Sequence, residues 1–152
     1  SLHDALPILY EEGSTFEIGK SITLRDGKDV TIFATGIMVA EALKAADELD
    51  KEGISVRVEN MFTLKPIDKE AILKCAKETG AIVTAENHSI LNGLGSAVAE
   101  VITENELVPL ERVGVEDRFG QVGPVDYLKE QYNLTYKDIM SKVKKVLERK
   151  IK

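Results

Sequence analysis

The strongest constraint on this chain is a regular alternation of short apolar runs with longer segments whose apolar residues recur at helical spacing. Four runs have the β-rich composition of buried strands, namely residues 30–34, 54–59, 81–85 and 110–115. Strands that alternate with helices predict a mainly parallel sheet with helices on both faces. No repeat or inner linker divides the 152 residues, which fits a single α/β domain.

Four long helices are expected, and their ends carry recognisable signals. The first follows residues 35–36, and the third covers residues 92–105. For the second, Asp68 is a typical N-cap, and Gly80 stands just past the end, where a left-handed residue is often required. Thr135, with Asp138 three residues later, predicts a capping box for the last helix, with Asp in place of the usual Glu.

The remaining segments predict an edge strand and a loop. Residues 16–24 have an extended pattern, followed by a turn at residues 25–28, and we expect this piece to join the sheet antiparallel at one edge. Residues 116–124 form a glycine-bearing loop, and Pro124 opens a short helix through Tyr127 and Leu128.

Charge and composition exclude several classes of protein. The net charge of −6 argues against nucleic acid as a general partner. Between 137 and 152, seven basic residues stand against two acidic ones, a local excess of +5 that leaves −11 for the remainder. This tail is either an electrostatic docking surface or a solvated helix with cations near its C-terminal end. No apolar run approaches a membrane span. A single cysteine, with no basic and apolar leader, favours a cytoplasmic protein without an internal disulfide.

His88 is the first candidate for chemistry. It lies just after the third predicted strand, where open α/β sheets place their ligand sites. With Glu86 two residues before it, a general base and its orienting group are conceivable if the strand continues through both. The alternative is a polar loop that caps the following helix or contacts a neighbouring subunit.

The glycine run at residues 92–98 resembles a dinucleotide fingerprint but departs from it. Val98 stands at the third glycine position, and the glycines do not directly follow the strand. Gly93 and Gly95 are therefore expected to let a helix N-terminus approach another backbone closely, although its free amides would still suit an anion. Cys75 shares a helix stripe with apolar residues and is interpreted as a buried thiol. The residues alone provide no catalytic or metal-binding set.

Four segments, in this order and spacing, resemble the C-terminal domain of transketolase, above all of enzymes split into two polypeptides. They are Ile18-Gly19-Lys20 with Arg25-Asp26-Gly27-Lys28-Asp29-Val30-Thr31-Ile32, then Thr63-Leu64-Lys65-Pro66-Ile67-Asp68, then Glu86-Asn87-His88 with Gly93-Leu94-Gly95-Ser96-Ala97-Val98-Ala99-Glu100, and last Gly114-Val115-Glu116-Asp117-Arg118-Phe119-Gly120 with Gly123. The likeness runs from about residue 6 to the end of the chain.

The resemblance implies a three-layer α/β/α domain with a mostly parallel, five-stranded mixed sheet at residues 16–152, and a linker or truncation junction at 1–15. It implies a holoenzyme that uses thiamine diphosphate and Mg²⁺, held by other domains, so that this part carries no catalytic, cofactor-binding or metal-binding residue. The implied partners are the N-terminal thiamine-diphosphate-binding domains or subunit and a second copy in a homodimer. The candidate subunit-contact residues are Glu86, Asn87, His88, Gly93 and Gly95.

Two positions depart from the family pattern. Asn92 stands where the family commonly has glycine, and asparagine tolerates the left-handed region. His3 stands where the family has an arginine for substrate phosphate, so that role does not transfer. Related readings remain open: the same domain of a deoxyxylulose-phosphate synthase, or of a 2-oxo acid dehydrogenase beta subunit that docks a partner. An independent nucleotide-binding protein is the least supported alternative.

Overall fold

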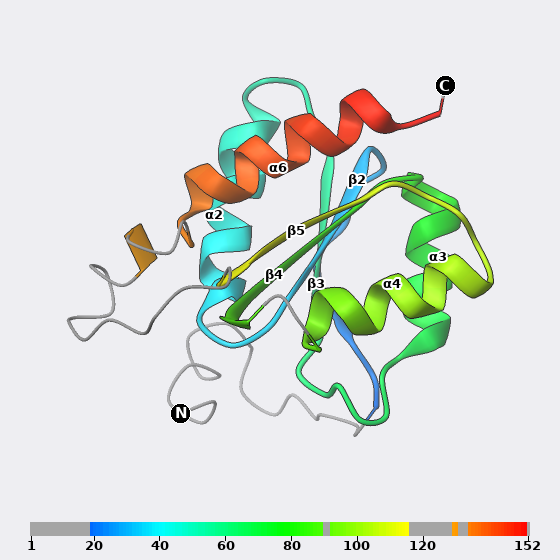
Figure 1. The fold of residues 1–152 in the computed structure, drawn as a ribbon. Coiled ribbons are helices and arrows are strands. Elements are labelled where there is room, and N and C mark those ends of the chain that lie inside the picture. The colour runs from blue at the N-terminus through cyan, green and yellow to red at the C-terminus, as the bar shows by residue number, and fades with distance from the viewer. Residues whose placement is uncertain (1–18, 90–91, 116–128, 131–133, 152) are drawn as a thin grey trace.

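In the computed structural model, residues 19–89, 92–115, 129–130 and 134–151 are described, and they form a sheet flanked by helices (Figure 1). In chain order the elements are β1 (Ile22–Arg25), β2 (Val30–Ala34), α2 (Met38–Asp50), β3 (Val56–Asn60), α3 (Lys69–Thr79), β4 (Ile82–Ser89), α4 (Leu94–Glu104), β5 (Leu110–Val115) and α6 (Tyr136–Arg149). The predicted junction at 1–15, the glycine loop and the short helix near Pro124 lie outside the described residues.

The strands form one five-stranded sheet in the order β1-β3-β2-β4-β5. Strand β1 pairs antiparallel with β3, and the other neighbouring pairs are parallel. The predicted mixed sheet with an antiparallel edge strand is therefore confirmed. The strand expected at 81–85 continues to Ser89, because Ser89 pairs with Val115 after an irregular stretch of register. Its polar second half hides this continuation from a search for apolar runs.

Helices cover both faces of the sheet, as predicted. Helices α2 and α6 lie together over one face, and α3 and α4 lie over the other (Figure 1). The apolar stripe of α4 is buried at Leu94, Val98, Val101 and Ile102. Strand β2 lies in the middle of the sheet, and all five of its residues are buried. The result is a three-layer α/β/α arrangement.

The predicted helix signals are confirmed by geometry. The Asp68 Oδ1 atom accepts a hydrogen bond from the Ala71 amide at 3.1 Å, and Gly80 ends α3 with φ of 70°. The backbone amide and the hydroxyl of Thr135 both donate to Asp138 Oδ2, at 2.8 Å and 2.7 Å. The local sequence therefore fixes where α3 and α6 begin.

The turn before β2 is bound tightly to the start of β3. A Cβ atom on Gly27 would lie 2.2 Å from the Val56 carbonyl carbon, so only glycine fits there. The Ser55 amide donates to Asp29 Oδ2 at 2.7 Å, and Arg57 Nε donates to the Gly27 carbonyl at 3.1 Å. Gly27 and Asp29 belong to the first of the four segments that resemble transketolase, and their role there is structural.

The basic C-terminal segment holds its own helix on the sheet. Glu111 on β5 is buried and forms ion pairs with Arg149, with Lys145 at 3.5 Å and with Lys142 at 3.6 Å. The Arg149 side chain also donates to the Leu110 carbonyl at 2.8 Å. Three of the basic residues in this segment are thus paired with a carboxylate of the same chain. Neither of the two interpretations of the segment predicts this pairing.

These cations also change the acidity of Glu111. Burial alone would raise the pKa of its carboxyl group. The hydrogen bond from Arg149 and the positive charges of Lys145 and Lys142 outweigh burial, and the pKa of Glu111 is lowered from its ordinary value. The carboxylate form is therefore favoured by the fold.

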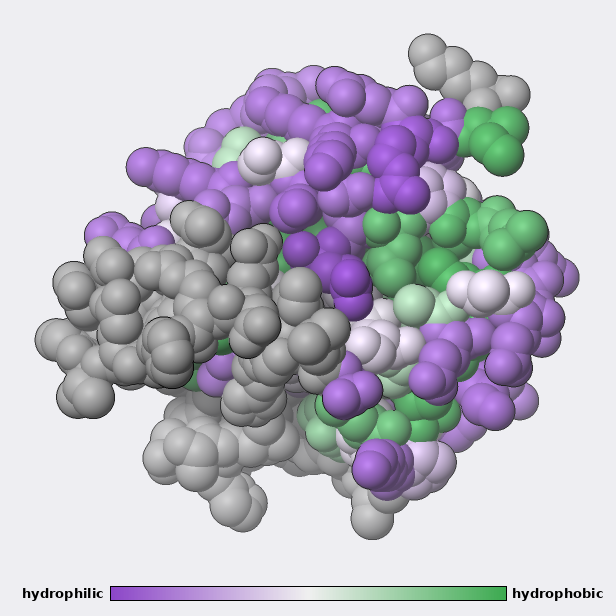
Figure 2. Space-filling model, viewed as in Figure 1, coloured by the Kyte–Doolittle hydropathy of each residue, from purple (hydrophilic) through white to green (hydrophobic). Residues whose placement is uncertain are grey.

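The described residues are mostly hydrophilic on the face that Figure 2 presents. Hydrophobic residues gather on the right of that view, where Figure 1 places the connection from α4 into β5. Leu107 in this connection is 78% exposed, and Val108 and Leu110 beside it are half-buried. Among the described residues, no helix is long and apolar enough to cross a membrane.

We predict that Glu111→Gln lowers the free energy of unfolding by about 1 to 2 kcal/mol near pH 7, because three cations lose a buried partner. The folded-state pKa of Glu111 is lowered, so its contribution is present above the unfolded-state pKa of about 4.3 and is lost as the pH falls through the folded-state pKa. Urea unfolding between pH 3 and pH 7 measures both effects. Glu148→Gln, on an exposed carboxylate, is the matched control, and equal stability of the two variants would contradict this account.

Candidate functional site

The candidate residues lie where the carboxyl ends of the parallel strands meet, the usual location of ligand sites in open α/β sheets. Strand β4 brings Glu86, Asn87 and His88 to this edge of the sheet. Helix α4 begins beside them, after Gly93, and runs back over the sheet. The end of β4 and the start of α4 therefore form one local unit.

Glu86 is the N-terminal cap of α4. Its Oε1 atom accepts a hydrogen bond from the Leu94 amide at 2.9 Å, and its Oε2 atom accepts one from the Gly95 amide at 2.8 Å. The residue is only 2% exposed. A carboxylate at this position satisfies two amides that the helix cannot pair and complements the positive end of the helix dipole. Glu86 thus binds the helix to the strand.

This cap changes the interpretation of the glycine run. The sequence left open that free amides at the start of α4 bind an anion, such as a nucleotide phosphate. The Leu94 and Gly95 amides instead donate to Glu86. A phosphate there would have to displace a buried carboxylate of the same charge, so these two amides are unsuited to anion binding.

The small residues of the run have separate local roles. A Cβ atom on Gly95 would lie 2.6 Å from Arg112 Cδ and 3.0 Å from Thr84 Oγ1, so this glycine lets α4 approach β4 and β5. The sequence predicts that the start of this helix lies close to another backbone. The helix does approach the sheet closely, but the atoms nearest to Gly95 belong to side chains of the strands. Asn92 has φ of 61°, which confirms the left-handed conformation expected for it.

The catalytic hypothesis for Glu86 and His88 meets one of its conditions. Strand β4 does continue through both residues. However, both carboxylate oxygens of Glu86 accept backbone amides, so Glu86 is not the group that orients a base. The side chain of His88 lies outside what the structure describes. Asn87 is half-buried, and its Oδ1 atom would lie 3.3 Å from a Cβ added to Gly36.

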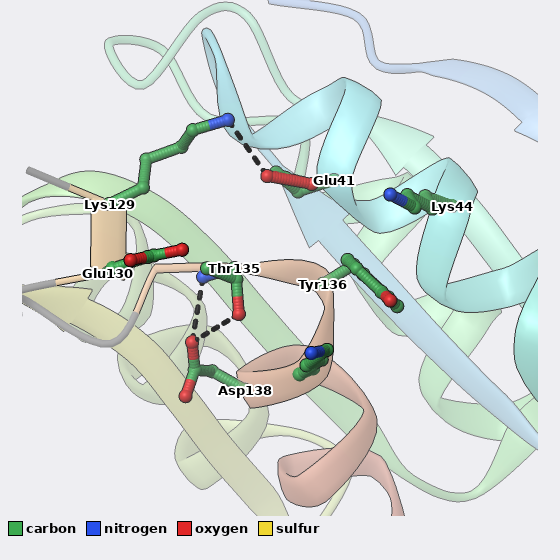
Figure 3. A pocket seen from close by; sticks show the side chains of 8 residues that line it. Glu41, Lys44, Lys129, Glu130, Thr135, Tyr136 and Asp138 are labelled. Carbon is green, nitrogen blue, oxygen red and sulfur yellow. Dashed lines mark hydrogen bonds and ion pairs between the residues drawn. The ribbon is translucent and has the colours of Figure 1, made fainter. Parts of the chain in front are cut away.

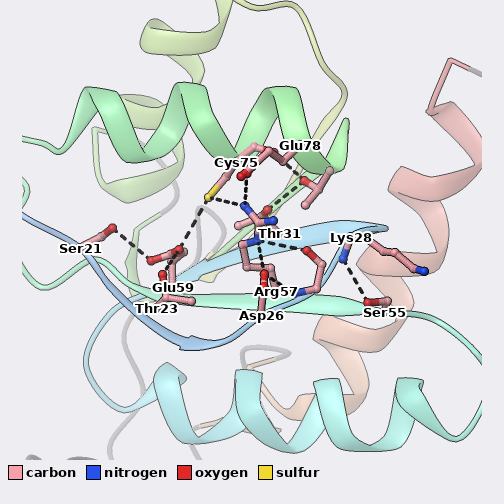
Figure 4. A network of polar contacts seen from close by, with 12 residues as sticks. Ser21, Thr23, Asp26, Lys28, Thr31, Ser55, Arg57, Glu59, Cys75 and Glu78 are labelled. Atoms are coloured by element: carbon pink, nitrogen blue, oxygen red, sulfur yellow. Dashed lines mark hydrogen bonds and ion pairs between the residues drawn. The ribbon is translucent and has the colours of Figure 1, made fainter.

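A second polar cluster lies between α3 and the antiparallel edge of the sheet (Figure 4). Glu59 on β3 accepts hydrogen bonds from Thr23 Oγ1 at 2.6 Å and Ser21 Oγ at 3.1 Å. Arg57 on the same strand forms ion pairs with Asp26 at 3.2 Å and Glu78 at 3.5 Å. Glu59 and Arg57 therefore both have partners within the chain. Their contacts connect the segment around β1 to β3 and α3.

Cys75 lies at the centre of this cluster and is 1% exposed. Its sulfur is 3.7 Å from Arg57 Nη1 and 3.7 Å from Glu59 Oε1. Burial raises the pKa of the Cys75 thiol to about 11, against the opposing effect of the Arg57 hydrogen bond. The predicted burial is confirmed, although the thiol meets polar groups as well as the apolar stripe of α3.

A hollow of about 570 Å³ lies between α2 and the start of α6 (Figure 3). Lys129 pairs with Glu41 across it at 2.8 Å, and Lys44 lies 4.2 Å from the centre of the Tyr136 ring. Asp138 belongs to the capping box of α6. These contacts connect α2 to the residues at and before the start of α6.

We predict that Glu86→Ala lowers the free energy of unfolding by about 3 kcal/mol, because two buried amides lose their acceptor. Glu86→Gln should cost about half as much, since its one oxygen replaces one of the two acceptors. Urea unfolding measures both, with Glu148→Ala at an exposed position of α6 as the control. A Glu86→Ala variant as stable as the unmodified chain would show that the cap is dispensable.

We predict that Cys75 reacts slowly with a thiol reagent at pH 7 to 8, because it is buried and its pKa of about 11 leaves almost no thiolate. Denaturant should accelerate labelling to the rate of an exposed cysteine. Rapid labelling of the native chain would show that α3 is rotated away from the position described.

Comparison with known proteins places this arrangement in a family. The family model for the transketolase C-terminal domain matches residues 19–139. The 6-deoxy-6-sulfo-D-fructose transketolase subunit SqwH of Clostridium sp. (strain MSTE9) is 58% identical over 139 residues, which cover 91% of this chain and 43% of that protein. The 1-deoxy-D-xylulose-5-phosphate synthase of Heliobacterium modesticaldum is 46% identical over 132 residues, which cover 86% of this chain and 20% of that protein.

A solved structure has the same fold. A split gene transketolase, described as an inactive beta4 tetramer, superposes with a TM-score of 0.92 at 49% identity, covering 96% of this chain and 48% of that one. The chain therefore spans less than half the length of these relatives. Together with the family-model match, these likenesses show that the chain belongs to the transketolase C-terminal domain family.

Proposed function

We propose that this chain is the assembly domain of a transketolase that transfers a two-carbon ketol unit between sugar phosphates. The observation that carries the proposal is the family match over residues 19–139 in a chain that spans 43% of a transketolase subunit. The chemistry is assigned to N-terminal thiamine-diphosphate-binding domains or a partner subunit. The contribution of this chain is to hold subunits together.

The transketolase family depends on thiamine diphosphate, and the described residues do not fit that group. The diphosphate needs amide or cationic donors and a Mg²⁺ ion held by oxygen ligands. The amides of Leu94 and Gly95 already donate to Glu86. The described part of the chain also contains no group of three His, Cys, Asp or Glu residues placed to hold a metal ion. No step of the reaction is therefore assigned to this chain.

The proposed contact is the unit formed by the end of β4 and the start of α4, and we assign contact with the partner to Asn87, His88 and Gly93. Within this unit Glu86 and Gly95 are buried, so we assign them the role of fixing α4 on the sheet. The solved relative is described as a tetramer of beta subunits, which supports self-association of such a chain.

A second candidate is the equivalent domain of a deoxyxylulose-phosphate synthase. The 46% identity to the Heliobacterium modesticaldum synthase supports it, and the 58% identity to a transketolase subunit favours the first proposal. Combining the chain with its N-terminal partner and testing for ketol transfer and for deoxyxylulose-phosphate formation separates the two.

We predict that the chain alone binds no thiamine diphosphate in the presence of Mg²⁺ and has no transketolase activity. Isothermal titration calorimetry on the purified chain measures the first, with the complete enzyme as the positive control. Binding in the micromolar range to the chain alone would refute the assignment of the cofactor to other domains.

We predict that Gly93→Val weakens subunit association in the complete enzyme, because a branched side chain is added within the proposed contact, and that activity falls with the loss of the assembly. His88→Ala should have a milder effect of the same kind. Sedimentation equilibrium and steady-state kinetics on the same preparations measure both. Lost turnover of His88→Ala in an intact assembly would make His88 a residue of the substrate site instead.

A further inference from the structure

A groove of about 460 Å³ runs along the outer side of α4, between this helix and the connection from β3 to α3. The helix lines it with residues at i, i+3 and i+4 spacing, which form one continuous stripe from Gly93 to Asn105. Half-buried Leu64 and Ile67 line the opposite side. The groove begins at Gly93 and therefore continues from the proposed contact.

The two banks of the groove carry opposite charge. Lys65 in the connection and Lys69 at the start of α3 stand on one bank, and Glu100 and Glu104 stand on the helix bank. All four residues are exposed to solvent. In the part of the chain that the structure describes, none of the four forms an ion pair, whereas most other charges around the sheet are paired.

Opposite unpaired charges on the two banks make the groove self-complementary. A two-fold axis that runs along such a groove places the lysine bank of one copy against the glutamate bank of the other, and the reverse contact follows by symmetry. A partner of a single charge would be attracted by one bank and repelled by the other. The small residues Gly93, Ser96 and Ala97 on the helix stripe let the lysine bank of a second copy approach α4 closely.

We propose that this groove is an isologous contact surface whose occupant is the same groove of a second copy of the chain. The proposal rests on the assembly role inferred above and names its surface and its partner. In the contact, Lys65 and Lys69 of one copy face Glu100 and Glu104 of the other. The apolar side chains of Leu64 and Ile67 are then withdrawn from water together with the small residues of the helix stripe.

Charge reversal tests this contact in the full chain. Lys65→Glu with Lys69→Glu makes both banks negative, and Glu100→Lys with Glu104→Lys makes both positive. Each double variant should weaken self-association by about 100-fold or more, because like charges then face each other in two symmetric places. An equimolar mixture of the two variants should form a heterodimer with an affinity close to that of the unmodified chain.

Sedimentation equilibrium of each variant and of the mixture provides the measurement, and a thermal unfolding curve establishes that each variant is folded. The control is Lys74→Glu with Lys77→Glu on exposed positions of α3, which changes the net charge equally and should leave association unchanged. Variants that associate like the unmodified chain, or a mixture that stays dissociated, would overturn the proposal. If Gly93→Val still weakened assembly in that case, the assembly role would stand with a different surface.

Discussion

The position of α4 depends on the buried carboxylate of Glu86, which joins the end of a strand to the first turn of a helix. In many α/β proteins, free amides at such a helix start bind a ligand phosphate. Here a side chain of the protein itself takes that place. A helix start that could bind an anion is therefore used for stability, and the same cap fixes the position of α4 on the sheet.

Two other buried carboxylates attach outer elements to the sheet in a similar way. Glu111 on β5 gathers three cations of α6, and Glu59 on β3 accepts hydrogen bonds from the β1 side. Each acid lies on a strand, and each group it binds comes from an element at the periphery. The apolar cores on the two faces supply most of the burial, while these polar contacts fix the register of each outer element.

Much of the fold could be predicted from the sequence because the informative signals are local. The cap at Asp68, the capping box at Thr135 and the left-handed Gly80 each depend on a few neighbouring residues. The far part of β4 could not be predicted, because pairing with β5 holds polar residues in a strand. A polar loop that caps the following helix is among the alternatives that the sequence leaves open. The sequence could not predict that Glu86 accepts hydrogen bonds from the Leu94 and Gly95 amides, because this pairing depends on how the chain folds back after β4. The partners of Glu111 come from 31 to 38 residues away, beyond the reach of a local pattern.

The central claim is that this domain contributes association and no chemistry, and amide hydrogen exchange tests it most directly. Exchange should be compared for the chain at low concentration, at a concentration where it associates, and with thiamine diphosphate and Mg²⁺ added. We predict that association slows exchange on α4 and on the connection from β3 to α3, and that the cofactor leaves exchange unchanged throughout the chain. Slower exchange around Leu94 and Gly95 on addition of cofactor to the dilute chain would contradict the account.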